Sequence, residues 1–187
     1  LWQRMWRGGV YPANRLIGSA ISAIDIALWD IKGKLFETPV YQLLGGRCRD
    51  HVEAFTNPGY LNNDHEMDAS DLLGCVAKAD PDATVEQLIQ QLRAVRGTLG
   101  DELELMVDLH TRLAPDEAVW FCREVEPLGI FAVEDPIRSE HPHGYGRIRS
   151  QTTVPLAAGE QWVARWEFRE PVEQEWIDYA RDDICIT

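Results

Sequence analysis

The chain has 187 residues, of which 18 are Lys or Arg and 31 are Asp or Glu, so its formal net charge at pH 7 is −13. Such a negative field repels phosphate backbones, which argues against a nucleic-acid partner. No apolar run approaches the roughly 18 residues that a membrane span needs, and no signal-peptide pattern opens the chain, so no membrane partner is expected.

The N-terminal segment of the chain, up to Gly46, predicts helices rather than strands. Residues 1–11, with two Trp, two Arg and a Gly pair, predict an aromatic and cationic loop that either joins the core or forms a lid. Residues Arg15–Phe36 form the strongest predicted helix, because apolar side chains recur there at steps of three and four. This stripe consists of Ala20, Ile24, Ala27, Leu28, Ile31 and Leu35. A shorter helix, Val40–Leu44, leads to Gly45-Gly46, which indicates a flexible domain junction.

From Arg47 onward, predicted strands and helices alternate. The strands are expected near Val52–Thr56, Cys75–Ala79, Glu104–Asp108, Ile130–Glu134, Leu156–Gly159 and Asp183–Ile186. The helices are expected near Glu66–Leu73, Thr84–Leu99, Pro115–Leu128, Tyr145–Ser150 and Arg165–Tyr179. This alternation is typical of an α/β fold with a parallel sheet, which is either open and doubly wound or closed into an eight-stranded barrel.

Three of the predicted strands lead directly into a carboxylate. Asp108, Glu134 and Glu160 follow one another at intervals of 26 residues, which fits one strand, one helix and two short loops. Carboxylates at successive strand ends favour the barrel, because its catalytic groups collect at one mouth. There they would repel each other by about 4 kcal/mol per close pair at an effective dielectric constant of 20. A divalent cation removes that repulsion, so the spacing predicts a magnesium site.

The four cysteines stand far apart, with no Cys-x-x-Cys pair among Cys48, Cys75, Cys122 and Cys185. Three of them sit in apolar surroundings, as buried free thiols do. This distribution favours a reduced, cytoplasmic protein over a disulfide framework or a zinc site.

Several motifs carry a family resemblance. Residues 19–34 (SAISAIDIALWDIKGK) and 39–46 (PVYQLLGG) resemble the mandelate racemase and muconate-lactonizing branch of the enolase superfamily. Val133–Pro136 and Ala158–Gln161 are similar to the second and third metal-ligand motifs of that branch. Residues 108–112 (DLHTR) resemble the Asp-x-His signature of its galactonate-dehydratase-type sugar-acid dehydratases.

The resemblance implies a modified (β/α) barrel of the TIM type with a capping domain over its mouth. Residues 1–46 would be the C-terminal helical part of the capping domain. Residues 47–187 would be the first part of the barrel, with about six of eight strands, so we expect the sequence to be part of a longer protein. The resemblance also implies bound Mg²⁺, a homo-oligomer, and removal of a proton next to a substrate carboxylate.

The chemistry of that reaction explains the predicted site. Removing a proton next to a carboxylate adds a second negative charge, which a divalent cation stabilises as a Lewis acid. Mg²⁺ prefers oxygen ligands, and the predicted ligands are Asp108, Glu134 and Glu160. The resemblance implies that the reaction is Mg²⁺-dependent dehydration of a sugar acid such as galactonate, through an enediolate, to a 2-keto-3-deoxy acid.

The residues around the predicted ligands receive roles of their own. His110 follows Asp108 by two positions, so on an extended strand end both side chains would point into the mouth, and the resemblance makes His110 the general acid. Arg112 continues the alternation as a predicted substrate-binding residue. Asp135 would point away if Glu134 points in.

Lys78 and the general base bear on the alternatives. Lys78 is a predicted substrate-binding residue, with a balancing charge or a structural role as alternatives. Val76 stands where one branch of the superfamily has the first residue of a Lys-x-Lys base. The resemblance places the base of the dehydratases on a His at the seventh strand, supported by an Asp at the sixth, and we expect both beyond residue 187. A racemase or cycloisomerase of the same superfamily, a non-catalytic metal-binding relative and an inactive fragment remain alternatives.

Overall fold

The computed structural model describes residues 1–10, 13–52, 74–78 and 84–186. They fall into two compact units, which are described separately below. The first unit comprises the described residues of 1–52 together with 160–167 and 182–186, and the second comprises those of 53–159 together with 168–181.

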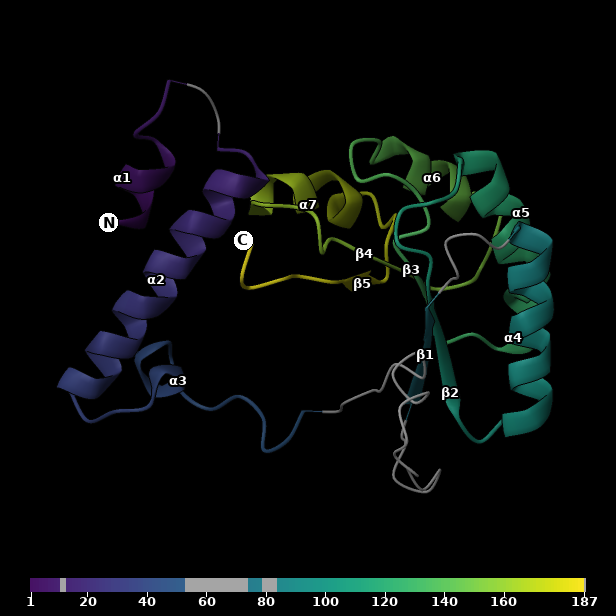
Figure 1. Cartoon of the computed structure of the whole chain (residues 1–187), viewed down its shortest axis with the longest axis horizontal. Coiled ribbons are helices and arrows are strands. Elements are labelled where there is room, and N and C mark those ends of the chain that lie inside the picture. The colour runs from purple at the N-terminus through teal and green to yellow at the C-terminus, as the bar shows by residue number, and fades with distance from the viewer. Residues whose placement is uncertain (11–12, 53–73, 79–83, 187) are drawn as a thin grey trace. The chain divides into compact units, whose positions relative to one another are not determined.

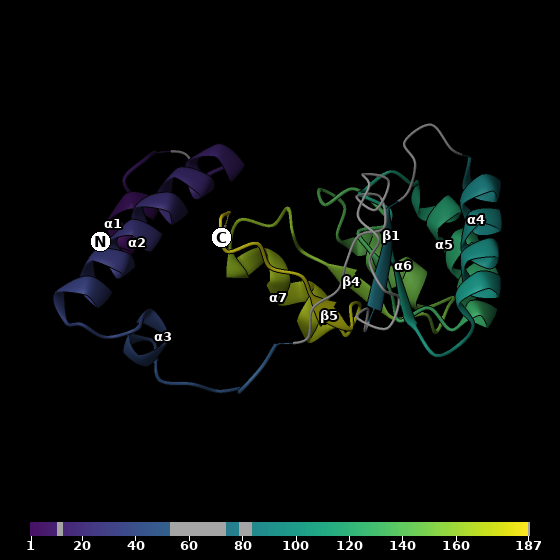
Figure 2. The same cartoon turned by 60° about the horizontal axis from the view of Figure 1, so that its bottom comes forward.

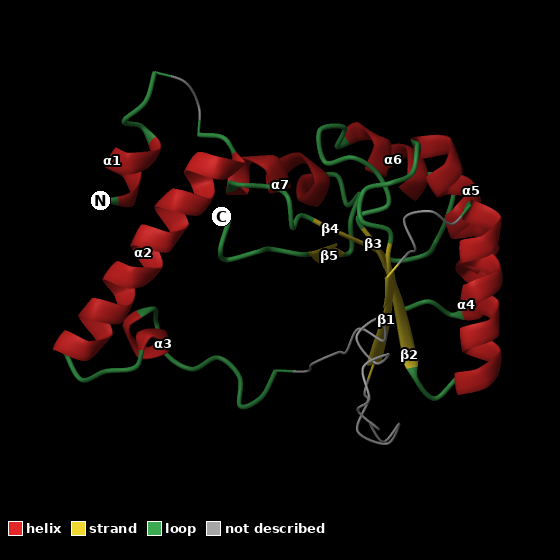
Figure 3. Ribbon diagram, in the orientation of Figure 1, coloured by secondary structure: helices red, strands yellow, loops and turns green. Residues whose placement is uncertain are grey.

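The second unit is built on a parallel sheet with strands in chain order, β1-β2-β3-β4-β5 (Figures 1 and 3). Every neighbouring pair is parallel. The strands are β1 (Gly74–Lys78), β2 (Glu104–Asp108), β3 (Ala132–Glu134), β4 (Leu156–Ala158) and β5 (Tyr179–Ala180). Sequential parallel strands joined by helices are the pattern of a (β/α) barrel, so the predicted α/β class and parallel sheet are confirmed.

Helices of the second unit cover one side of this sheet. They are α4 (Val85–Leu99), α5 (Pro115–Val125), the short 3₁₀ helix η3 (Glu126–Leu128) and α6 (His143–Arg149). Figures 1 and 2 both show α4 and α5 on the same side of β1 and β2, and α5 contacts α4 and α6. Leu105 of β2 and Phe121 of α5 are fully buried in the core. Burying each such side chain stabilises the fold by about 1.5–3 kcal/mol relative to leaving it exposed.

The start and end of α4 follow from its sequence. Thr84 and Gln87 form a capping box, in which each side chain accepts a hydrogen bond from the backbone N–H of the other, at 3.3 and 2.7 Å. Gly100, with φ at 70°, ends the helix as predicted. Near this end, the Arg96 guanidinium donates hydrogen bonds to four backbone carbonyls of the loops that precede β2 and β3. The acceptors are Gly100, Leu103, Leu128 and Gly129.

Cys48, Cys122 and Cys185 are free thiols, but the prediction that three of the four cysteines are buried is wrong. Cys122 of α5 is buried, whereas Cys48 and Cys185 are exposed. Burial raises the pKa of the Cys122 thiol to about 12, so this thiol stays protonated and unreactive at neutral pH.

The first unit contains α1 (Trp2–Trp6), α2 (Arg15–Leu35) and α3 (Val40–Leu43), and α2 contacts the other two. The Asn14 side chain caps α2 by accepting a hydrogen bond from the backbone N–H of Ile17 at 3.0 Å. Along the predicted stripe of α2, Ile24, Ile31 and Leu35 are exposed. Among the described residues, α2 is the longest helix, and no helix there combines the length and apolarity of a membrane span.

The last part of the chain differs from the prediction. The helix expected over Arg165–Tyr179 ends at Glu173 (α7, Arg165–Glu173), and Tyr179–Ala180 forms β5 instead. The strand expected over Asp183–Ile186 is therefore wrong, because these residues form a turn after β5. The helix expected near Glu66–Leu73, and all but the first residue of the strand expected near Val52–Thr56, lie outside the described residues.

Candidate functional site

Three described strands end in a charged residue at the same edge of the sheet. The register pairs Lys78 of β1 with Asp108 of β2, and Asp108 with Glu134 of β3. Because parallel strands share one carboxyl edge, these residues form a row along it. Glu160 follows the last residue of β4 by two positions, so chain connectivity keeps its backbone near the end of that strand. The side chain of Lys78 lies outside the described part of the chain.

The loops after β2 and β3 hold non-glycine residues in left-handed backbone conformations. The angle φ is 51° at His110, 63° at Thr111 and 39° at Asp135. Such conformations cost about 1–3 kcal/mol each and gather at functional sites. The Thr111 N–H donates to the Asp135 carbonyl, and the Leu109 N–H to the Glu134 carbonyl, which fastens the loops to each other. The expectation of an extended backbone at His110 is wrong, because the chain turns at this residue.

His110 lies against the carboxylate of Asp108. The backbone N–H of His110 donates a hydrogen bond to Asp108 Oδ1 at 2.8 Å, and His110 Nδ1 lies 3.5 Å from Asp108 Oδ2. The side chain of Asp108 is 15% exposed and that of His110 is 39% exposed. The backbone hydrogen bond thus ties His110 to Asp108, and the imidazole lies beside the carboxylate while staying partly exposed.

Glu134 and Asp135 form a buried carboxylate pair at the end of β3. One carboxylate oxygen of Glu134 lies within 4.8 Å of one of Asp135, and the two residues are 2% and 3% exposed. Asp135 Oδ1 accepts hydrogen bonds from the hydroxyl of Tyr145 at 3.3 Å and from the N–H of Gly159 at 3.4 Å. Alternation along the strand predicts that Asp135 points away from the mouth if Glu134 points in, but its carboxylate lies close to that of Glu134, since side chains alternate only on an extended backbone.

Replacing Tyr145 by Phe is expected to lower the free energy of unfolding by about 1.5–3 kcal/mol, because the lost hydrogen bond goes to a charged acceptor. The measurement is urea denaturation near neutral pH. Tyr179→Phe is the matched control, since Tyr179 is 42% exposed. An equal loss of stability in both variants would contradict a special contribution from the contact with Asp135.

The effect of Tyr145→Phe on stability should also depend on pH. Burial, followed by the charge of Asp135, raises the pKa of Tyr145 well above its ordinary value. The unfolded chain ionises this phenol near pH 10, whereas the folded chain does not, so the contribution of Tyr145 to stability is present below about pH 10 and falls above it. The stability difference between the parent and Tyr145→Phe should therefore shrink as the pH rises past 10.

Arg181, directly after β5, contacts the buried carboxylate of Glu134. Its Nε lies 2.8 Å from Glu134 Oε1 in an ion pair in which the Arg181 side chain is 42% exposed and that of Glu134 is 3% exposed. Sequence reasoning missed this contact, because residues 179–181 were expected at or just beyond the end of a helix. Tyr145 was also missed, since an apolar environment at the start of a predicted helix does not point to a carboxylate.

The other predicted site residues are less constrained. Exposure still alternates beyond the turn, with Thr111 and Leu113 buried and Arg112 exposed. A cation site needs several acidic, His or Cys side chains whose ligand atoms lie close together. Among the described residues, Asp108 is not part of any such group of three within 4.8 Å. The roles of Arg112, Lys78 and His110 stay predictions.

The side chains at this edge suit a hard divalent cation. Glu134 and Asp135 offer only carboxylate oxygens, which are the donors that Mg²⁺ prefers. Two buried carboxylates in close proximity also need positive charge nearby. The burial and the oxygen chemistry of Glu134 fit a magnesium ion held at the end of β3.

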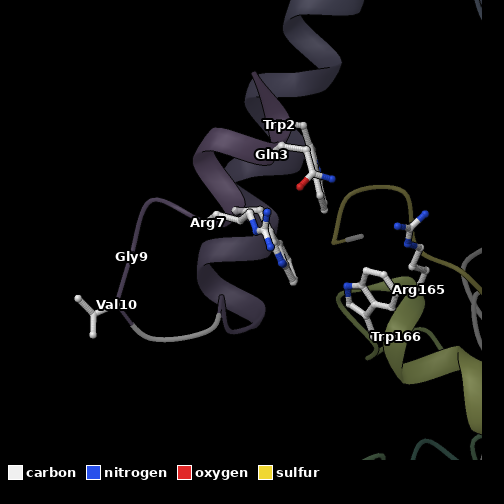
Figure 4. Close-up of a pocket in the computed structure, with 8 residues that line it drawn as sticks. Trp2, Gln3, Arg7, Gly9, Val10, Arg165 and Trp166 are labelled. Atoms are coloured by element: carbon white, nitrogen blue, oxygen red, sulfur yellow. The ribbon is translucent and has the colours of Figure 1, made fainter.

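The first unit contains a pocket of about 670 Å³ with a different chemistry (Figure 4). Trp2 and Trp6 stack with ring centroids 5.1 Å apart, and the Arg165 guanidinium lies 4.3 Å from the ring centroid of Trp166. The lining comprises Trp2, Gln3, Trp6, Arg7, Gly9, Val10, Arg165 and Trp166. It offers aromatic faces and guanidinium donors, and the lining residues include no carboxylate or imidazole for proton transfer.

Comparisons with known proteins agree with this architecture. Residues 73–187 match the family described as "Enolase C-terminal domain-like", and residues 1–45 match the mandelate racemase / muconate lactonizing enzyme N-terminal domain. A D-galactonate dehydratase from Variovorax paradoxus is 35% identical over 98% of this chain and 52% of its own length.

Solved structures extend the likeness to the fold. A 3,6-anhydro-D-galactonate cycloisomerase from Zobellia galactanivorans is 31% identical, with a TM-score of 0.87 over 99% of this chain and 54% of that chain. An enolase from Pantoea ananatis with bound D-gluconate and Mg is 25% identical, with a TM-score of 0.83 over 98% and 55%.

The chain thus spans about half the length of the relatives that it matches. Its motifs, its parallel sheet and both matched domains agree on one assignment. The chain belongs to the mandelate racemase and muconate-lactonizing enzyme family of the enolase superfamily.

Proposed function

We propose that the protein is a Mg²⁺-dependent dehydratase that converts a sugar acid of the aldonate class to a 2-keto-3-deoxy acid. The observation that carries the proposal is the contact between His110 and Asp108, together with the pairing of Asp108 with the buried Glu134 on the neighbouring strand. The similarity to the D-galactonate dehydratase of Variovorax paradoxus supports a six-carbon substrate of this class.

In the proposed site, Asp108, Glu134 and Glu160 would hold the cation, which would supply Lewis-acid stabilisation of the negative charge that develops on the substrate carboxylate. For Asp108 to serve as a ligand, one of its oxygens has to face the cation while the other keeps its contact with His110. Asp135 stays with Tyr145 and Gly159, and these hydrogen bonds hold the loop after β3 in place.

His110 acts as the general acid of the proposed reaction. With Nδ1 toward Asp108, Nε2 is the nitrogen that would carry the proton to the hydroxyl leaving from the β carbon. The fixed orientation matters because proton transfer needs the donor within hydrogen-bond reach of the departing oxygen. Arg112, which is exposed two positions later, would bind the substrate's hydroxyl or carboxylate groups.

A direct test incubates the full-length protein with a panel of six-carbon aldonic acids and Mg²⁺, and detects 2-keto-3-deoxy acid as its semicarbazone. We expect product from at least one acid, no product after chelation, and at least a 100-fold lower rate for Asp108→Asn, because Asp108 serves both the cation and His110. Asp101→Asn is the matched control, since this exposed acid precedes β2. A full panel without product would overturn the proposal.

A cycloisomerase is the second candidate, favoured by the similarity to the 3,6-anhydro-D-galactonate cycloisomerase. Both reactions begin by removing the proton next to the carboxylate, so the two candidates use the same cation and ligands. Mass spectrometry of the product distinguishes them. A dehydratase product has lost one water from the substrate, whereas a cycloisomerase product keeps the mass of the substrate.

A further inference from the structure

The ion pair between Arg181 and Glu134 joins residues from strands that are not neighbours. The Arg181 N–H donates a backbone hydrogen bond to the carbonyl of Ala158 in β4, at 2.9 Å. Its side chain then crosses the end of β4 and reaches Glu134 Oε1 at the end of β3, at 2.8 Å. The guanidinium therefore contacts a carboxylate that we propose as a ligand of the cation.

Gly159 leaves the space that this crossing requires. A Cβ atom on residue 159 would lie 2.9 Å from the Arg181 carbonyl oxygen and 2.3 Å from the ring of Phe168. The glycine also adopts φ of 130°, which side-chain-bearing residues rarely adopt. Residue 159 thus lets the backbone after β5 approach β4 closely enough for Arg181 to reach β3.

The chemistry of the pair makes Arg181 a competitor of any cation on Glu134. A guanidinium keeps its charge at all physiological pH values, and Glu134 is almost fully buried, so solvent screens this contact less than a surface pair. A dication on Glu134 would meet this positive charge at close range. Even at the dielectric constant of water, a unit charge about 6 Å from a dication weakens binding by about tenfold.

We propose that Arg181 sets the affinity of the site for its divalent cation by occupying Glu134. The inference rests on the proposed magnesium site and adds to it a residue that no family motif assigns. In the absence of the cation, Arg181 stabilises the buried carboxylate, and cation binding has to displace or share that contact.

The test measures Mg²⁺ binding by isothermal titration calorimetry and Mg²⁺-induced changes in the melting temperature, neither of which depends on activity. Arg181→Gln should bind Mg²⁺ at least about tenfold more tightly than the parent, and should show the larger rise in melting temperature. Arg181→Lys retains the charge and should stay within about threefold of the parent.

Arg169→Gln is the matched control, because Arg169 pairs with Glu173 within α7 and its loss removes the same charge from the chain. It should leave Mg²⁺ affinity unchanged. Should Arg181→Gln not fold, Arg181→Met, which keeps the apolar stem, provides the same comparison.

The outcomes separate this inference from the proposed function. A parent protein that binds no Mg²⁺ at millimolar concentration overturns the magnesium site itself. A parent that binds Mg²⁺, with unchanged or weaker binding in Arg181→Gln, overturns only the role of Arg181. Equal tightening in Arg181→Gln and Arg169→Gln would also overturn it, since the effect would then come from net charge alone.

Discussion

Glu134→Gln is expected to lower the affinity of the protein for Mg²⁺ at least about 100-fold, because the substitution removes the charge of a buried carboxylate that is a proposed ligand of the cation. At a Mg²⁺ concentration 100 times the parent's Kd, the parent gains about 2.7 kcal/mol of stability, whereas a variant with 100-fold weaker binding gains about 0.4 kcal/mol. Urea denaturation with and without Mg²⁺ measures both values.

Glu124→Gln is the control for this experiment. Glu124 lies on α5 in the same unit, forms a half-exposed ion pair with Arg93, and undergoes the same chemical change on substitution. It should keep the full Mg²⁺ response. A Glu134→Gln variant that is stabilised by Mg²⁺ as strongly as the parent would remove Glu134 from the proposed ligands.

His110→Asn is expected to reduce the rate of dehydration by about 10²–10⁴-fold, the usual contribution of a general acid. Asn suits this position because it tolerates the left-handed backbone that His110 adopts. The stabilisation of the variant by Mg²⁺ should stay close to that of the parent, since His110 is not among the proposed ligands. Steady-state kinetics with the best sugar acid of the panel measures the rate.

A substrate with a better leaving group tests the assigned role. When fluoride replaces the β-hydroxyl, departure needs less help from a proton donor, so the parent and His110→Asn should differ far less. His143→Asn is the matched control, because the His143 side chain is 67% exposed on α6. An equal loss of rate with both substrates would show that His110 does not protonate the leaving group.

The sequence predicted the elements whose ends are marked by local chemistry. Thr84 and Gly100 cap the two ends of α4. The strand β2 ends at Asp108, directly after its apolar run, as expected. The row formed by Asp108 and Glu134 also follows from strand periodicity. Such features depend on side chains and backbone bonds within a few residues, so a single sequence reveals them.

The errors come from contacts that are distant in sequence. β5 has only two residues, which are too few for a recognisable pattern, and its pairing with β4 defines it. The turn at His110 depends on the backbone of the neighbouring loop, since the N–H of Thr111 bonds to the carbonyl of Asp135. In both cases the contacting residues lie far away in the sequence, so the local segment alone does not reveal its structure.

The four carbonyls bound by Arg96 have a consequence for the dynamics of the second unit. They belong to the loops that precede β2 and β3, at the opposite end of the strands from Asp108 and Glu134. Opening either loop breaks hydrogen bonds to the same guanidinium that holds the other loop in place. The two loops should therefore exchange their amide hydrogens as one cooperative unit, which anchors the end of the sheet opposite Asp108 and Glu134.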